Sequence, residues 1–177
     1  IFLRNLMLSQ NDNRKLTETG PSTPMGNLFR NFWLPALLVE ELPAPDCPPK
    51  HIDILGEPLL AFRDSNNKVG IIDRRCPHRG ADLYYGRNEE CGLRCVYHGW
   101  KFDVNGNCIE LPTAPEGSVF KEKIKLTAYK TRELAGFIWV YMGSLVQTLP
   151  EIPKQEFTLL PNSHDFVNNE WPECNWA

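Results

Sequence analysis

The chain has 177 residues, of which 42% are hydrophobic and 23% are charged, and its net charge is −3 at pH 7. This length and hydrophobic content allow one sizeable core, so we expect one main domain. No basic excess indicates nucleic-acid binding, and no apolar run approaches the ~18 residues of a membrane span. Residues 1–8 are too short and too weakly patterned for a secretory signal, so the sequence predicts a cytoplasmic protein.

The N-terminal segment predicts a loop followed by one short helix. Residues 9–23 are polar and are expected to form the loop. Thr23 and Pro24 have the residue types of a helix N-cap and a first helical position, so the helix should begin there. The apolar face expected for this helix consists of Leu28, Phe29 and Phe32.

The rest of the chain up to residue 148 has the pattern of a small antiparallel β domain. Short apolar or alternating runs are separated by turn residues, which is typical of such domains. Strands are predicted over residues 33–39, 51–55, 59–63, 69–73, 100–103, 108–111, 124–131 and 136–142. The last of these is the most apolar and is expected to be central. Residues 42–50 form a predicted loop with four prolines.

Two short loops carry the most specific signal. Residues 76–80 read CPHRG and residues 95–100 read CVYHGW, so each loop offers one thiolate and one imidazole. This arrangement predicts a [2Fe–2S] cluster of the Rieske type, with Cys76 and Cys95 on one iron and His78 and His98 on the other. Two thiolates and two neutral imidazoles leave the oxidised site uncharged. It therefore accepts an electron more readily than a site with four thiolates.

A zinc site is the alternative for the same four residues. Two Cys and two His also form tetrahedral zinc sites. Common zinc spacings place two or more residues between paired ligands, whereas only one separates Cys76 from His78. Gly80 and Gly99 also suit tight loops that fold back over a cluster. The spacing therefore favours the Rieske interpretation over zinc.

The remaining cysteines and histidines have no metal-ligand pattern. Cys47, Cys91, Cys108 and Cys174 have no disulfide-framework spacing and are interpreted as free thiols. His51 and His164 lie far apart in the sequence and are interpreted as surface or packing residues. The sequence therefore provides no ligand pair for a second metal site and no candidate catalytic residue.

The cluster loops resemble those of Rieske oxygenases or ferredoxins rather than respiratory or photosynthetic Rieske proteins. The latter have an extra cysteine in each loop, and a serine near the second loop that raises the reduction potential. Ala81 and Tyr97 occupy the positions of the extra cysteines here, and Trp100 stands where the serine would be. The resemblance implies a potential near the low end of the Rieske range.

Both ends of the chain favour an oxygenase over a ferredoxin. Residues 20–35 (GPSTPMGNLFRNFWLP) and 173–177 (ECNWA) resemble the oxygenase component of ring-hydroxylating Rieske enzymes. The similarity is closest to the phthalate 4,5-dioxygenase group, which includes phenoxybenzoate dioxygenase and is related to vanillate O-demethylase. Residues 74–81 and 92–103 match that group's cluster loops especially well. The resemblance covers nearly the whole chain from Met7 onward.

The resemblance implies a domain organisation and a fold. An N-terminal arm would cover residues 1–23, a mainly β Rieske [2Fe–2S] domain residues 24–148, and a passage to a catalytic domain residues 149–177. The catalytic α+β domain, with a mononuclear Fe(II), would open at Asn175-Trp176 and is largely missing. We therefore expect the chain to be the N-terminal part of a longer subunit.

The resemblance also implies a function. An NADH-dependent flavin and iron–sulfur reductase would pass single electrons to the cluster. From there they would reach the mononuclear iron, in a homotrimer, where O₂ hydroxylates an aromatic and carboxylated substrate. Two alternatives stay open: a stand-alone Rieske ferredoxin, and an O-demethylase or another monooxygenase of the same build.

Charged and aromatic residues around the loops have two interpretations each. Residues 73–101 contain six basic and four acidic side chains, a local excess that either steers an acidic reductase or is ordinary solvated charge. Tyr97 and Trp100 either shield the cluster and hydrogen-bond its surroundings, or, for Trp100, act mainly as a hydrophobic lid.

Overall fold

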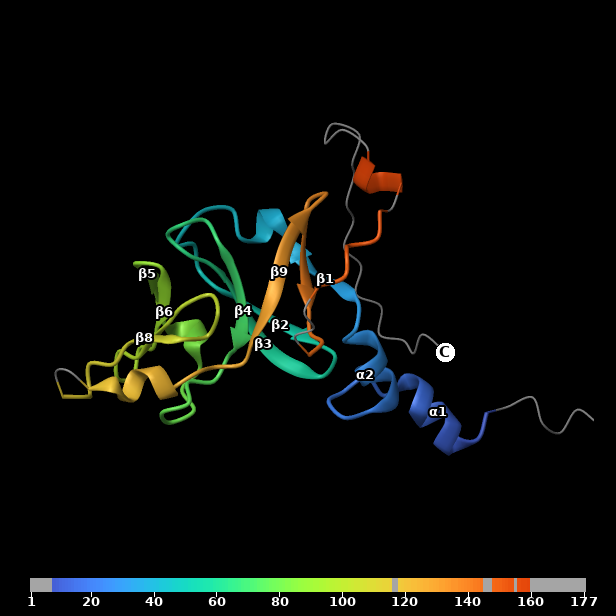
Figure 1. Ribbon diagram of the computed structural model, residues 1–177, viewed down its shortest axis with the longest axis horizontal. Coiled ribbons are helices and arrows are strands. Elements are labelled where there is room, and N and C mark those ends of the chain that lie inside the picture. Colours follow the sequence, from blue (N-terminus) through green and yellow to red (C-terminus); the bar gives the residue numbers. More distant parts are fainter. Residues whose placement is uncertain (1–7, 116–117, 145–147, 155, 160–177) are drawn as a thin grey trace, which may run out of the picture.

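Two antiparallel sheets form the frame of the molecule (Figure 1). The computed structural model describes residues 8–115, 118–144, 148–154 and 156–159. A six-stranded sheet has the order β1-β10-β9-β4-β3-β2, and a four-stranded sheet has the order β5-β6-β7-β8. The mainly β, antiparallel fold predicted from the sequence is confirmed. The strands are β1 (Trp33–Leu38), β2 (Lys50–Ile54), β3 (Glu57–Arg63), β4 (Val69–Asp73), β5 (Arg87–Glu89), β6 (Gly92–Arg94), β7 (Lys101–Phe102), β8 (Cys108–Glu110), β9 (Ala128–Leu134) and β10 (Phe137–Tyr141).

The predicted short helix is present as α2 (Pro24–Phe29), with the Thr23 hydroxyl accepting a hydrogen bond from the N–H of Gly26. Its predicted apolar face is wrong, because Leu28 is 50% exposed and Phe32, beyond the end of the helix, is 53% exposed. The buried residue of α2 is Gly26. A Cβ there would lie 2.2 Å from the carbonyl oxygen of Gly20, so the helix packs through bare backbone.

A second helix, α1 (Gln10–Thr17), replaces part of the loop predicted over residues 9–23. Its signals are local. Ser9 caps it by accepting from the N–H of Asp12, and Lys15 forms an ion pair with Asp12. No residue of α1 is buried, so the hydrophobic period that usually reveals a helix is missing.

The strands at the centre of the large sheet are buried on both faces. Along β3, Leu59 and Ala61 pack into one cluster, whereas Leu60 and Phe62 pack into another. Such alternation is the period of a strand with a core on each side. One cluster fills the space between the two sheets and includes residues of the loops described below. The other lies on the far face of the large sheet and includes Ile138 of β10.

Most predicted strands occur close to their predicted ranges, but three details differ. The short strands β5, with the sequence RNE, and β6, with the sequence GLR, were not expected, and they pair with each other. Strand β9 runs over Ala128–Leu134 rather than residues 124–131. Strand β10 is internal but lies between β1 and β9, one position from the edge, rather than at the centre.

The small sheet is an insertion between β4 and β9 and lies at the opposite end of the molecule from α1 (Figure 1). Asn88 of β5 joins it to the rest, because its amide donates to the carbonyl oxygens of Cys47, at 2.9 Å, and Arg63, at 2.8 Å. Among the described helices, none has the length and apolar character needed to cross a membrane. Three short 3₁₀ helices lie at Val39–Glu41, Leu83–Tyr85 and Val119–Lys123, and a fourth at Glu156–Leu159.

Candidate functional site

The first of the two Cys/His loops leaves the large sheet at the end of β4. The N–H of Cys76 donates to the carbonyl oxygen of Ala81 at 2.8 Å, and the N–H of Gly80 donates back to the carbonyl oxygen of Cys76 at 2.8 Å. Gly80 has a φ of 69° and open space around its Cα, so this position requires glycine for its backbone conformation. The loop is thus closed by its own backbone, with His78 at its turn.

The second loop connects β6 to β7 in the small sheet and repeats the same pattern. The N–H of Cys95 donates to the carbonyl oxygen of Trp100 at 2.8 Å, and the N–H of Gly99 donates to that of Cys95 at 3.0 Å. Gly99 has a φ of 73°. Two loops from two different sheets therefore present a cysteine and a histidine in equivalent backbone frames.

The structure brings the predicted ligands together in two pairs, the two cysteines and the two histidines. Cys76 and Cys95 are buried in the core between the sheets, close enough for their thiols to hydrogen-bond. The imidazole rings of His78 and His98 lie 4.5 Å apart between centroids, at an angle of 62°. Burial, with a smaller contribution from Cys95, raises the pKa of Cys76 to about 11, although the backbone N–H groups of His78 and Arg79 oppose the shift.

This donor set fits a [2Fe–2S] cluster with unequal irons. Nδ1 of His78 is buried and has no hydrogen-bond partner in the described part of the chain, as expected of a nitrogen that serves as a metal ligand. Within residues 8–115 and the later described segments, no three or more His, Cys, Asp or Glu side chains form one group that could hold a metal ion, and the predicted ligands lie as two pairs. Two sulfurs on one side and two imidazoles on the other match the Rieske pattern.

Aromatic side chains cover the two histidines. Trp100 is buried, its indole is stacked on the ring of His78 at 4.5 Å and 3°, and its Nε1 donates to Oγ1 of Thr113 at 2.9 Å. Tyr97 is exposed and lies 4.0 Å from the ring of His98. Trp100 therefore acts as a lid whose own polar atom is satisfied by Thr113. Sequence reasoning missed Thr113, because a lone threonine in a loop gives no signal.

Most of the charge excess around the loops is used internally. Lys101 is buried and forms ion pairs with Glu90 and Glu110, and Arg94 pairs with Glu89 and Glu110. In the part of the chain that the structure describes, Arg79 forms no ion pair and is exposed. Most of these residues therefore form ion pairs within the chain. Arg79 remains as the candidate for steering a partner.

The other described histidine and cysteines have their own surroundings, although Cys108 shares the core cluster of Cys76 and Cys95. His51 stacks on Tyr84 at 4.2 Å, and its Nε2 lies 3.3 Å from Oδ1 of Asp82. Cys91 is a turn residue between β5 and β6, with a φ of 61°. The described cysteines other than the predicted ligands, Cys47, Cys91 and Cys108, are free thiols, whereas Cys174 and His164 fall outside the described residues.

Comparisons with known proteins agree with this geometry. Residues 32–132 match the family model of the Rieske [2Fe–2S] domain. The chain is 45% identical to the 3-chlorobenzoate-3,4-dioxygenase oxygenase subunit of Comamonas testosteroni, over 93% of this chain and 38% of that protein. It is 43% identical to the phthalate 4,5-dioxygenase oxygenase subunit of Pseudomonas putida, over 97% of this chain and 39% of that protein.

A crystal structure of dicamba monooxygenase with non-heme iron and dicamba has a similar fold, with a TM-score of 0.58 and 31% identity over 65% of this chain and 34% of that chain. The chain belongs to the Rieske [2Fe–2S] domain family. More particularly, the curated relatives named above are oxygenase subunits of dioxygenases, and the similarity to them extends over nearly the whole of this chain. The chain spans about two-fifths of the length of the curated relatives named above.

Proposed function

We propose that Cys76, His78, Cys95 and His98 are the ligands of the Rieske cluster. The observation that carries this proposal is the convergence of two buried thiols and two imidazoles from loops with the same backbone hydrogen bonds. When bound, the cluster takes up and releases single electrons. The chain's own residues hold the ligands apart in two pairs, and Trp100 excludes water from His78.

For the full-length protein, we infer the role of electron entry to an oxygenase. An NADH-dependent flavin and iron–sulfur reductase would supply electrons to the cluster. They would serve O₂ activation at a mononuclear Fe(II) in the catalytic domain of the full-length protein. The names of the relatives, 3-chlorobenzoate and phthalate dioxygenase subunits, support an aromatic carboxylate as substrate. The homotrimer, the cytoplasmic location and the boundaries at residues 23 and 148 belong to the same proposal.

A stand-alone Rieske ferredoxin is the main alternative. The similarity to oxygenase subunits extends over 93% to 97% of the chain, including the N-terminal arm, which a carrier does not need. This extent favours the oxygenase. A monooxygenase or an O-demethylase shares the same electron-entry domain. Turnover of phthalate, 3-chlorobenzoate and a methoxybenzoate by the full-length protein separates these reactions. The first two substrates distinguish dihydroxylated from monohydroxylated products, and the third shows demethylation.

The first experiment measures iron per chain in the purified full-length protein. About three irons per chain is expected, two from the cluster and one from the mononuclear site. About two irons would instead support a carrier.

A pair of cysteine variants tests the ligand assignment. Cys95→Ser should abolish the visible absorption of the cluster, because serine replaces a ligating thiolate. Cys108→Ser is the matched control, since Cys108 is also a buried thiol of the same core cluster but lies outside the four-residue set. Loss of the cluster in both variants, or in neither, would contradict the assignment.

A further inference from the structure

The arginine immediately before each cluster-loop cysteine reaches across its own loop. Nη1 of Arg75 donates to the carbonyl oxygen of Gly80 at 3.3 Å, and Nη1 of Arg94 donates to the carbonyl oxygen of Gly99 at 3.2 Å. In both loops the accepting glycine lies four residues after the cysteine and has a positive φ. The two loops therefore share an arginine-to-glycine hydrogen bond in addition to the same backbone hydrogen bonds.

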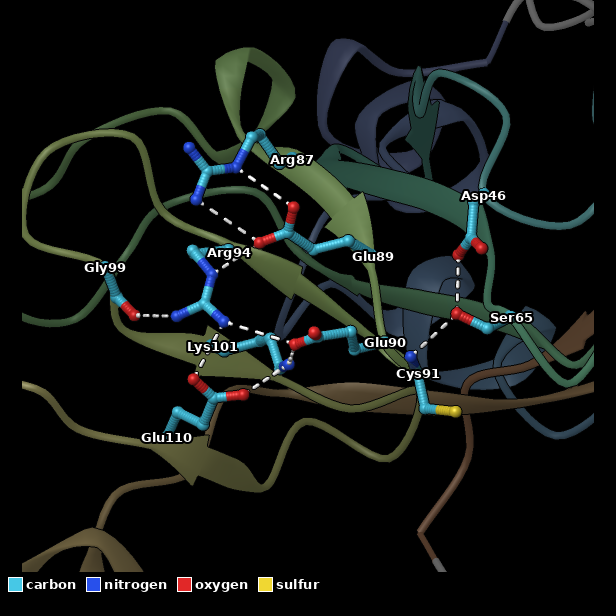
Figure 2. Close-up of polar contacts among 10 residues, drawn as sticks. All are labelled: Asp46, Ser65, Arg87, Glu89, Glu90, Cys91, Arg94, Gly99, Lys101 and Glu110. Atoms are coloured by element: carbon cyan, nitrogen blue, oxygen red, sulfur yellow. Dashed lines mark hydrogen bonds and ion pairs between the residues drawn. The ribbon is translucent and has the colours of Figure 1, made fainter.

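Arg94 is the more firmly held of the two. Its side chain is only 15% exposed, its Nε lies 2.7 Å from Oε1 of Glu89, and its Nη2 lies 2.8 Å from Oε2 of Glu110 (Figure 2). These carboxylates belong to β5 and β8, at the two edges of the small sheet, and Arg94 belongs to β6. Each carboxylate uses a different edge of the planar guanidinium, and Nη1 is left to point at the loop.

Arg75 lacks this support. Its side chain is 54% exposed, and its ion-pair partner, Asp82, is 4.0 Å away. An exposed arginine retains most of its rotamer freedom, so its bond to the Gly80 carbonyl restrains the first loop less. Both loops thus have the same arginine-to-glycine hydrogen bond, but the arginine is held more firmly in the second loop.

The bond to Gly99 bears directly on His98, its neighbour in the chain. Glycine at a φ of 73° has no side chain to restrict its backbone, so hydrogen bonds fix the orientation of its two peptide groups. The N–H of Gly99, in the peptide that follows His98, is held by the carbonyl oxygen of Cys95. The carbonyl oxygen of Gly99 is held by Arg94. Near Gly99, a Cβ would meet only the ring of Pro112. The Arg94 guanidinium makes its three contacts from three separate nitrogens in one plane, whereas an ammonium group has a single nitrogen and cannot reach all three positions in the same way.

We propose that Arg94 is a positioning residue of the cluster site: Glu89 and Glu110 hold its guanidinium, which fixes the Gly99 carbonyl and thereby the placement of His98. This inference rests on the proposed function, because it assumes that His98 is a cluster ligand. The equivalent contact from Arg75 positions the first loop more weakly.

The test compares variants of the full-length protein by cluster lifetime and by spectroscopy. In Arg94→Lys and Arg94→Gln, the cluster should be lost in air about tenfold faster or more, in line with the usual effect of removing a group that orients a metal ligand. The electron paramagnetic resonance signal of the reduced cluster should broaden or shift, since the imidazole geometry changes. Arg75→Gln should show the same effects in smaller degree.

Arg87→Gln is the matched control. Arg87 pairs with the same Glu89 and carries the same charge, but it is 70% exposed and forms no contact with the loop. It should leave both readouts unchanged. Arg94→Lys keeps a cation beside Glu89 and Glu110, so folding is expected to survive in this variant even if Arg94→Gln unfolds.

The proposal is overturned if both Arg94 variants keep the lifetime and the spectrum of Arg87→Gln. Loss of folded structure in both Arg94 variants, measured by circular dichroism, would also overturn it, because Arg94 would then be a stabilising residue only. A wild-type protein without a [2Fe–2S] spectrum would be a different result, since it would refute the proposed function itself.

Discussion

At the scale of single residues, the site depends on groups that shield or orient the four ligands. The Trp100 ring covers His78, and its N–H is satisfied by Thr113 rather than directed at the cluster position. The geometry of Trp100 has features of both roles considered from the sequence, because the ring stacks on His78 and its N–H bonds a neighbouring side chain. Tyr97 lies against His98 from the solvent side and is a less complete cover.

Trp100→Ala should shorten the lifetime of the cluster in air and destabilise the protein. Truncating a buried tryptophan leaves a cavity and typically costs about 3–5 kcal/mol of unfolding free energy. Decay of the visible absorption and chemical denaturation measure the two effects. Trp100→Phe is the control, since it keeps an aromatic ring over His78. It loses the bond to Thr113, worth about 1 kcal/mol, and part of the indole's volume. Equal lifetimes for the alanine and phenylalanine variants would mean that the ring gives no protection.

At the scale of elements, α2 and the small sheet are stabilised by different interactions: close backbone packing in α2 and ion pairs in the small sheet. Helix α2 approaches the chain at Gly20 through the bare backbone of Gly26. The small sheet is short, and its outer strands are joined by charged side chains: Lys101 and Arg94 lie between Glu89, Glu90 and Glu110 (Figure 2). Each element therefore has a different weak point.

Gly26→Ala should destabilise the N-terminal segment. The added Cβ would lie 2.2 Å from the carbonyl oxygen of Gly20 and 2.4 Å from that of Thr19, and neither backbone atom can move without displacing the helix. Overpacking of this kind typically costs about 1–3 kcal/mol. Thermal denaturation measures the loss, and limited proteolysis locates it. Asn27→Ala, an exposed change in the same helix, serves as the control; a Gly26 variant as stable as this control would contradict the packing described.

The small sheet should weaken in acid. The Lys101 ammonium, followed by Arg94, holds the pKa of Glu110 below its usual range, although burial opposes this, and Arg94, then Arg87, lowers the pKa of Glu89. A carboxyl group with a lowered folded-state pKa contributes stability above its ordinary pKa of 4.5, and loses it as the pH falls through the folded-state value. The free energy of unfolding should therefore fall below about pH 4.5.

Glu110→Gln should flatten this pH dependence, because it removes one of the titrating groups. Thermal melting between about pH 7 and pH 3 measures the slope in both proteins. Glu122→Gln is the control, since Glu122 is exposed and has no ion pair among the described residues. An unchanged slope in Glu110→Gln would show that the ion pairs of Glu110 carry none of the acid sensitivity.

At the scale of the whole molecule, the site exists only where the two sheets meet. The first loop extends from β4 of the large sheet and the second joins two strands of the small sheet, so their relative placement sets the ligand geometry. Shared core packing, with Leu60 and Phe62 on one side and Leu93 and Phe102 on the other, holds the sheets together. Asn88 adds a polar tie.

Partner docking also belongs to this scale. Arg79 is exposed beside His78 and is without an ion pair in the described segments, so it remains available to an acidic reductase. Arg79→Glu should slow electron transfer from the reductase several-fold and weaken its dependence on salt. Stopped-flow reduction at two ionic strengths measures both. Arg87→Glu, the same charge change on a residue paired with Glu89, is the control; rates insensitive to salt and to Arg79→Glu would rule out steering by this residue.

Features that depend on residue type and on short spacing could be predicted from the amino-acid sequence. Local chemistry and periodicity were enough to predict the Cys and His pairs, the glycines at positive φ, the Thr23 cap and most strands. Helix α1 shows the limit of periodicity, since its capping signals are local but it buries no side chain.

Contacts between residues far apart in the sequence could be identified only from the tertiary structure. Three examples are strand β5, which pairs with β6, Trp100, which covers His78, and Arg94, which forms ion pairs with Glu89 and Glu110. Sheet pairing and loop closure bring these residues together. The physical reason is that such contacts depend on the relative placement of whole strands, whereas capping and turn formation depend on a few neighbouring residues.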